Sequence, residues 1–277
     1  MRPSEVVQRG SIYLERHDVE APRVSAEELM IRVLGIDRAS IYARTEGLTT
    51  AEARAYGRAL CRRCTGTPLQ HLTGEQGFRR LVLTVRPGVF IPRPETEVLV
   101  DVALAEIEGC DAPIVVDLCT GSGAVALAIA DEHPGARVLA TDTSSDAVAL
   151  AEENASRLGL AIDVFRGNLF EPLPPDHRGS VDMVVANPPY LPAELSSTLP
   201  AEVRADPPEA LFGDVELTAR IFEEATRWLR PGGTVAVETD EGSAGAVAAS
   251  ARAAGLEGVR IRTDLAGRDR VVSARTR

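Results

Sequence analysis

Lysine is absent from this chain of 277 residues, and all 30 basic residues are arginine. That absence excludes chemistry that needs a lysine amine, such as Schiff-base catalysis and phosphate binding by a Walker A loop. Histidine and cysteine are scarce, with four of each. Four cysteines in so long a chain do not make a secreted disulfide framework, and Cys61-x-x-Cys64 has no second pair with which to bind zinc. We therefore expect reduced thiols and no metal site.

Long hydrophobic runs are also missing, since no apolar stretch reaches the roughly 20 residues of a membrane span. The first residues include the charged Arg2 and Glu5, where an export signal would be apolar. We expect a cytoplasmic, monomeric protein that does not contact membranes. The net charge is −11, although residues 1–80 hold 13 arginines and 10 acidic residues. An acidic main part disfavours direct binding of nucleic acid, because phosphate neutralisation dominates nonspecific affinity.

A helical pattern occupies the first part of the chain, from Ser4 to about Arg63. Ser25 has Glu28 three residues later, the spacing of a capping box at a helix start, and Thr49 or Thr50 begins another helix. The pattern predicts a helical domain over residues 1–75. A β-hairpin follows as a linker, with strands at 78–85 and 89–91 and a turn at Pro87-Gly88.

Short apolar strands and helices alternate through the remainder, so that residues 76–277 form a second domain with the hairpin. The predicted strands are 114–118, 138–141, 162–165, 181–186 and 234–238. The predicted helices are 124–132, 145–158, 217–229 and 243–254. This alternation is typical of an α/β fold with a doubly wound, mostly parallel, Rossmann-like sheet. Residues 259–263 and 270–274 predict an antiparallel hairpin at one side of it.

Asn187-Pro188-Pro189-Tyr190 follows one of these strands and indicates a clamp for an amino group. The Asn187 side-chain oxygen and the Pro188 carbonyl can accept hydrogen bonds from one planar NH2, and Tyr190 offers a flat face to the group that carries it. Two successive prolines stiffen the backbone and donate no hydrogen bond. A plain proline-rich turn is the alternative interpretation.

Asp117-Leu118-Cys119-Thr120-Gly121-Ser122-Gly123 lies where the strand at 114–118 turns into a helix. Glycine there lets a ligand approach the backbone, and the helix N-terminus offers free N–H groups. Asp142, at the end of the next strand, is placed to bind ribose hydroxyls. An NAD oxidoreductase shares these features. The carboxylate of Asp117 suits the positively charged amino group of S-adenosylmethionine better than a pyrophosphate.

Together the two motifs resemble those of class I S-adenosylmethionine methyltransferases, and Asn-Pro-Pro-Tyr resembles their amino-methylating branch. More narrowly, the chain resembles the HemK/PrmC family of release factor glutamine methyltransferases. The supporting stretches include Thr67 to Gly74, Pro87 to Glu97 and Asp264 to Arg270.

The resemblance implies an enzyme that methylates the glutamine of the Gly-Gly-Gln loop in peptide chain release factors, with a helical domain that helps to hold the factor. It implies S-adenosylmethionine contacts from Asp117 and residues 119 to 123, from Asp142 and Asn187, and from Asn168 and Leu169 near the adenine. It makes Asn187, Pro188 and Tyr190 the catalytic group, adds Pro189, Arg93 and Pro94 as substrate contacts, and makes Thr96 a helix cap.

Three departures from the family pattern bear on this expectation. Cys119 replaces a glycine, which predicts an ordinary φ at that position. Leu169 can pack against the adenine but cannot bond to it, whereas Asn168 can bond to its amino group. Residues 206–215 differ from the usual glycine-rich segment. This difference leaves two other functions open. The chain could be a paralogue that methylates another protein or a small metabolite amide or amine, or a cofactor-binding protein without catalysis that only docks a partner.

Overall fold

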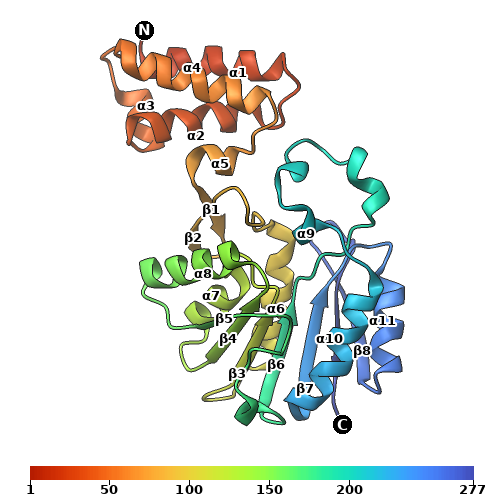
Figure 1. Ribbon diagram of the computed structural model, residues 1–277. Helices are drawn as coiled ribbons and strands as arrows, with labels where there is room; N and C mark the ends of the chain where they lie inside the picture. Colours follow the sequence, from red (N-terminus) through yellow and green to blue (C-terminus); the bar gives the residue numbers. More distant parts are fainter. The chain divides into compact units, whose positions relative to one another are not determined.

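The computed structural model describes residues 1–277 and divides into two units (Figure 1). One consists of Met1–Glu75 with Leu199–Ala205, and the other of Gln76–Thr198 with Asp206–Arg277. Within the first unit, Glu202 forms an ion pair of 2.6 Å with the buried Arg63. A division at residue 75 therefore misses one segment, which returns to the first unit from a distant part of the chain. No helix has both the length and the apolar character needed to cross a membrane.

The first unit is helical: its elements are α1 Pro3–Glu15, α2 Pro22–Leu34, α3 Arg38–Ala43, α4 Thr50–Cys64 and α5 Leu69–Thr73. Its core is formed by eight buried apolar side chains, which include Leu14, Met30 and Tyr56. The helix start at Thr49 is confirmed, because the Thr49 hydroxyl accepts from the Glu52 amide and the Glu52 carboxylate accepts from the Thr49 amide.

The prediction that a helix begins at Ser25 is wrong. Helix α2 begins at Pro22, three residues earlier, since proline in the first turn has its φ already set for a helix and lacks only an N–H that would be unpaired there. Ser25 lies inside the helix, and its buried hydroxyl accepts a hydrogen bond from Arg63 Nε at 3.4 Å. Glu28 forms an ion pair with Arg38 and caps nothing.

The hairpin is present, but at a different position in the chain. Its strands are β1 Glu75–Phe78 and β2 Leu81–Thr84, and the turn falls at Arg79, which has a φ of 51°. The Arg79 guanidinium holds the turn by ion pairs with Asp101 and Glu132. Residues 89–91 form no strand, because Val89 packs instead against Ala147 and Leu150.

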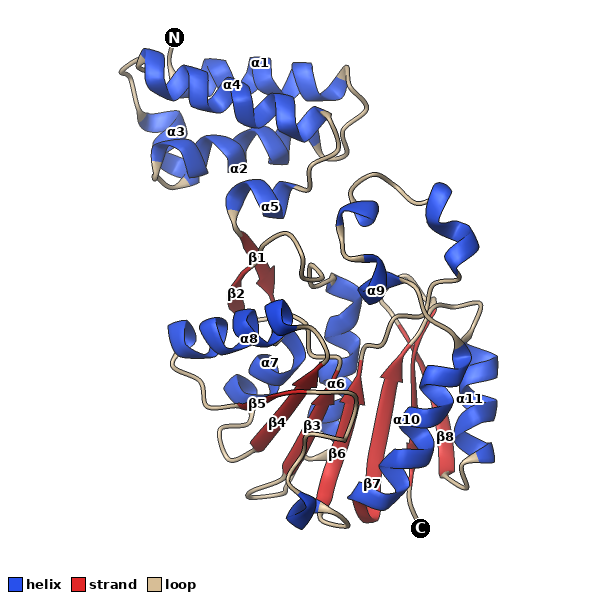
Figure 2. Cartoon of the chain, in the orientation of Figure 1, coloured by secondary structure: helices blue, strands red, loops and turns tan.

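A seven-stranded sheet forms the centre of the second unit, in the order β5-β4-β3-β6-β7-β9-β8 (Figure 2). The strands are β3 Ile114–Leu118, β4 Arg137–Asp142, β5 Asp163–Arg166, β6 Val181–Ala186, β7 Leu229–Glu238, β8 Glu257–Thr263 and β9 Asp269–Arg275. Strands β3 to β7 are parallel, and β9 is antiparallel to both β7 and β8. The predicted Rossmann-like sheet and its antiparallel hairpin are confirmed.

Helices cover both faces of this sheet, and each face has its own hydrophobic core. One face packs against α6 Glu97–Glu106, α7 Ala124–Glu132 and α8 Ser145–Leu158, and the other against α10 Val215–Trp228 and α11 Ala244–Ala253. Because successive strand residues point to opposite faces, Val115 and Val116 belong to different cores. Ligand sites in such sheets lie at the carboxyl ends of the strands.

Candidate active site

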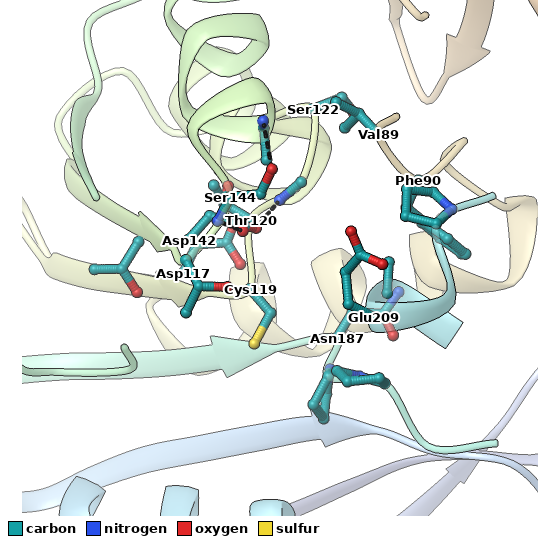
Figure 3. Close-up of a pocket in the computed structure, with 18 of the residues that line it drawn as sticks. Val89, Phe90, Asp117, Cys119, Thr120, Ser122, Asp142, Ser144, Asn187 and Glu209 are labelled. Atoms are coloured by element: carbon teal, nitrogen blue, oxygen red, sulfur yellow. Dashed lines mark hydrogen bonds between the residues drawn. The ribbon is translucent and has the colours of Figure 1, made fainter. Parts of the chain in front are cut away.

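A cavity of about 280 Å³ opens at the carboxyl ends of β3, β4 and β6. Figure 3 shows Asp117, Cys119 and Asp142 on one side of it and Asn187, Glu209 and Phe90 on the other. The chain brings both predicted motifs to this cavity, although they lie far apart in the sequence. Pro188, Pro189 and Tyr190 line it as well, as do Thr120, Gly121, Ser122, Asn168 and Leu169.

Asp117 is only 1% exposed, at the end of β3. Its Oδ2 accepts hydrogen bonds from the Thr120 hydroxyl at 2.6 Å and from the Ala126 amide at 3.1 Å. No arginine pairs with it. Burial therefore raises the pKa of Asp117 to about 7, against the effect of these two hydrogen bonds. When ionised, a buried carboxylate without a partner cation can pair with a cationic group of a ligand.

The prediction of an ordinary φ at Cys119 is wrong. Its φ is 58°, which lies in the left-handed region. Such a residue costs roughly 1–2 kcal/mol relative to an ordinary conformation. The turn requires it, since the next amide, that of Thr120, donates to the Thr141 carbonyl at 3.1 Å and so ties β3 to β4. Burial raises the pKa of the Cys119 thiol, which therefore stays protonated.

Gly123 is not among the residues that line the cavity. It has a φ of 83°, and a Cβ there would lie 3.1 Å from the Ala151 Cβ. The glycine thus allows α7 to begin close against α8, which is a packing role.

The Asp142 carboxylate is fixed by the backbone. Its Oδ2 accepts from the Gly121 amide and its Oδ1 from the Ser144 amide, both at 2.9 Å. Burial raises the pKa of Asp142, and hydrogen bonds from Ser144, Gly121 and Thr143 lower it. Each oxygen keeps a second lone pair, so that a pair of ligand hydroxyls can donate to this rigid acceptor.

The Asn187 side chain has a defined orientation. Its Nδ2 donates to the Thr96 hydroxyl at 3.3 Å, and no protein group donates to its Oδ1. Thr96 was expected to cap α6, but it makes no capping hydrogen bond, because a turn of 3-10 helix, Pro94–Thr96, precedes the α-helix. Its hydroxyl instead accepts the hydrogen bond from Asn187 at the cavity. No local pattern marks this role, since Thr96 and Asn187 are 91 positions apart in the chain.

Tight backbone packing holds the proline segment after Asn187. The Leu191 amide donates to the Leu211 carbonyl at 2.9 Å, and the Gly213 amide donates to the Leu191 carbonyl at 3.1 Å. A Cβ at Gly213 would lie 2.1 Å from the Pro189 carbonyl oxygen, so only glycine fits there. The segment 206–215, which departs from the family pattern in sequence, thus supports the Asn-Pro-Pro-Tyr loop.

Arg93 and Pro94, the two predicted substrate contacts before α6, do not line the cavity. Arg93 forms an ion pair with the buried Asp206 and lies 5.3 Å over the ring of Phe90. Phe90, Thr96 and Glu209 line the cavity in their place and were missed. Glu209 belongs to the short helix α9 Pro208–Leu211, and no periodic pattern marks so short an element.

The side chains around the cavity fit S-adenosylmethionine. Asp117 offers an anion for the ligand's ammonium group, and Asp142 offers acceptors for its ribose hydroxyls. Leu169, which is 4% exposed, gives an apolar surface for a ring, and Asn168 lies beside it in the lining. The Ser122 hydroxyl is buried without a partner in the protein, which leaves a donor for the ligand.

Comparison with known proteins agrees with this geometry. A model of the PrmC N-terminal domain matches residues 5–74, and a model of the methyltransferase small domain matches residues 83–201. Among solved structures, the ribosomal protein L11 methylase of Lactobacillus delbrueckii subsp. bulgaricus has a TM-score of 0.51 at 22% identity, and the match covers 70% of this chain and 84% of that chain. At this identity the likeness concerns the fold alone.

Two curated relatives are much more similar in sequence. The release factor glutamine methyltransferase of Moorella thermoacetica is 41% identical over 260 residues, which cover 91% of this chain and 90% of the relative. That of Deinococcus radiodurans is 38% identical over 280 residues, which cover 99% of each. Because such relatives match it over nearly its whole length, this chain belongs to the release factor glutamine methyltransferase family.

Proposed function

We propose that this protein transfers a methyl group from S-adenosylmethionine to the side-chain amide nitrogen of a glutamine in the Gly-Gly-Gln loop of a peptide chain release factor. The observation that carries the proposal is the orientation of Asn187, whose Nδ2 is bound to Thr96 while its Oδ1 is free. The Pro188 carbonyl is also free, since no amide donates to it. Two free acceptors on successive residues that line the cavity match the two hydrogens of a primary amide.

An amide nitrogen is a poor nucleophile because its lone pair is delocalised into the carbonyl. When bound, S-adenosylmethionine supplies an electrophilic methyl group on a sulfonium. Asn187 and Pro188 accept both N–H groups of the substrate, which turns the nitrogen lone pair toward that methyl and stabilises the positive charge that develops on nitrogen. The new N–C bond forms as the S–C bond breaks, and the nitrogen then loses one proton to water.

Tyr190 contributes a surface and no proton. Burial raises its pKa, so the phenol stays protonated at neutral pH. Its ring and the neighbouring prolines line the cavity beside Asn187 and limit the access of water to the amide. Exclusion of water strengthens the two hydrogen bonds to the substrate.

Mass spectrometry of a release factor incubated with the enzyme and S-adenosylmethionine tests the proposal. We expect a gain of one methyl group on the glutamine of the Gly-Gly-Gln loop, and none on a factor in which that glutamine is replaced by alanine. A factor that stays unmodified while the enzyme binds S-adenosylmethionine normally would contradict the proposed substrate.

The affinity for S-adenosylmethionine is expected to decrease as the pH falls through about 7, the pKa of Asp117. Above that pH the carboxylate is ionised and pairs with the ligand's ammonium group, whereas below it the group is protonated and neutral. Binding therefore releases a proton near neutrality, which calorimetry in buffers of different ionisation enthalpy measures. In Asp117→Asn the affinity should be lower and should vary less with pH; an unchanged pH dependence would assign the effect to another group.

We further propose that the helical unit contacts the release factor through α4. Arg54, Arg58 and Arg62 are exposed at successive i, i+4 positions of this helix, and their side chains form no ion pair or hydrogen bond. Like charges at this spacing weaken a helix. An acidic surface on the release factor would offset that repulsion. The helical unit would then add affinity for an intact release factor, and a short peptide, which has no such surface, would not gain it.

Changing these three arginines to glutamate should raise the KM for an intact release factor by about tenfold, at roughly 0.5 kcal/mol for each exposed charge pair. The KM for a short Gly-Gly-Gln peptide should not change, and high salt should reduce the difference between wild type and variant. Steady-state kinetics with both substrates measures this. An equal loss on the peptide would assign the arginines to the stability of the enzyme.

A further inference from the structure

Every charged side chain that lines the active-site cavity is acidic. The lining contains Asp117, Asp142 and Glu209, but none of the 30 arginines and none of the histidines of the chain. Charges of one sign in a cleft produce a field that favours a ligand of the opposite net charge. Ser122, which is 2% exposed and whose hydroxyl has no partner in the protein, lines the same cavity and is an independent sign that a ligand belongs there.

Glu209 differs from the other two acidic residues in what surrounds its carboxylate. Asp117 and Asp142 accept hydrogen bonds from protein groups, which hold both side chains in place. The Glu209 carboxylate accepts no hydrogen bond from the protein and forms no ion pair. Glu209 is exposed on the short helix α9, and Figure 3 shows it on the side of the cavity that faces Asp142. Its negative charge is therefore available to a ligand.

The charge of the cofactor changes during the reaction. S-adenosylmethionine carries an ammonium, a carboxylate and a sulfonium group, so it is a net cation. When the S–C bond breaks, its electron pair stays on sulfur, and the methyl group carries the positive charge to the substrate nitrogen, which then loses a proton to water. The demethylated product is a thioether without net charge. The two forms share their adenosine and amino acid parts, so the methyl group and its charge are what distinguish them.

We propose that Glu209 is a specificity-determining residue, which selects S-adenosylmethionine over its demethylated product by the positive charge on sulfur. The inference rests on the cofactor of the proposed function and is independent of the protein substrate. In that function Asp117 pairs with the ammonium group and Asp142 with the ribose, and both cofactor forms have these groups. Glu209 is the remaining charge in the lining, and the sulfonium is the remaining positive group of the ligand.

This preference would assist turnover, because product that stays bound blocks the next molecule of S-adenosylmethionine. Its size is limited by solvent. Glu209 is exposed, so water and salt screen its charge, and single exposed charge interactions are weak. We therefore expect Glu209 to contribute a factor of about three to the ratio of the two affinities at low ionic strength.

Calorimetric titration without a methyl acceptor tests the proposal, because no ligand is then consumed. At about pH 8, above the pKa of Asp117, the cavity carries its full negative charge. Three ligands are compared: S-adenosylmethionine, its demethylated product, and an analogue with a CH–NH3⁺ group in place of the S⁺–CH3 group. Glu209→Gln should bind the two cationic ligands about threefold more weakly and the neutral product unchanged. Added salt should reduce the difference between wild type and variant.

Two further variants serve as controls. Glu194→Gln removes the same charge from the same connection between β6 and α10, but Glu194 is exposed in the turn Ala193–Ser197 and does not line the cavity. It should leave the affinity for all three ligands unchanged. Glu209→Asp keeps the charge at the site and should keep most of the preference for the cationic ligands.

Two results would overturn the proposal. If Glu209→Gln weakened binding of all three ligands equally, Glu209 would shape the cavity without responding to charge. If it changed the affinity for none of them, its carboxylate would face solvent only. Failure of wild type to bind S-adenosylmethionine would instead contradict the proposed function, and that outcome is seen before any variant is made.

Discussion

Replacing Asn187 with alanine is expected to reduce kcat for methylation by on the order of 10²–10³, the usual cost of removing one preorganised group at a site where charge develops. The Asn187 side chain is held by Thr96 before the substrate arrives, so no free energy is spent to orient it during the reaction. Alanine leaves one substrate N–H without an acceptor in a cavity that limits the access of water. Affinity for S-adenosylmethionine should change much less, because we propose that Asp117 and Asp142 hold the ligand's charged and hydroxylated parts.

Single-turnover kinetics and calorimetry on the same variant separate these two effects. Tyr190→Ala is the comparison, since loss of its ring removes contacts made equally in the ground state and the transition state. That variant should raise KM more than it lowers kcat. If Asn187→Ala turned over at nearly the wild-type rate, the Asn-Pro-Pro-Tyr segment would not act as an amide clamp.

Replacing Asp142 with alanine should weaken binding of S-adenosylmethionine by roughly 1.5–3 kcal/mol, the range for charge-assisted hydrogen bonds. The variant loses the proposed acceptor for ribose, and it also leaves the Gly121 and Ser144 amides without their partner. Both amides belong to turns that line the cavity, so their shape should loosen as well. Asp142→Asn keeps one acceptor and should fall between wild type and alanine.

Asp214→Ala is the matched control, because Asp214 also accepts from a backbone amide but caps α10 and does not line the cavity. Its loss should cost about 1 kcal/mol of stability, the usual value for a helix cap. Calorimetric titration and thermal unfolding of both variants distinguish a binding residue from a structural one. Equal ligand affinity in Asp142→Ala and wild type would remove Asp142 from the cofactor site.

The local pattern of the sequence was sufficient for most of the second unit. Strands β3 and β6 and helices α7 and α8 have the predicted bounds, because fully buried strands read as short apolar runs and turns mark their ends. Parallel strands that alternate with helices bring their carboxyl ends to one edge. For that reason Asp117, Asp142 and Asn187, each at the end of a strand, were expected at one site and line one cavity.

The backbone conformation at the turns could not be predicted as well from the local sequence pattern. The φ of 58° at Cys119 follows from the bond between the Thr120 amide and β4, and the amino-acid type alone predicts the opposite. Arg93 was expected to contact the substrate, but it pairs with Asp206, a residue 113 positions away. The chemical type of an arginine does not specify which of many carboxylates it meets.

The sequence by itself determined the order of the elements, the two motifs and their place at strand ends, because hydrophobic period and turn residues are local properties. Only the tertiary structure decided what surrounds Asn187. Thr96 and Gly213 come from separate parts of the chain, and they reach the Asn187 segment through the hydrogen bond between Asn187 and Thr96 and through the return of the loop after Tyr190. Hydrogen-bond direction and burial depend on such long-range contacts, so the orientation of the Asn187 amide is a property of the folded chain.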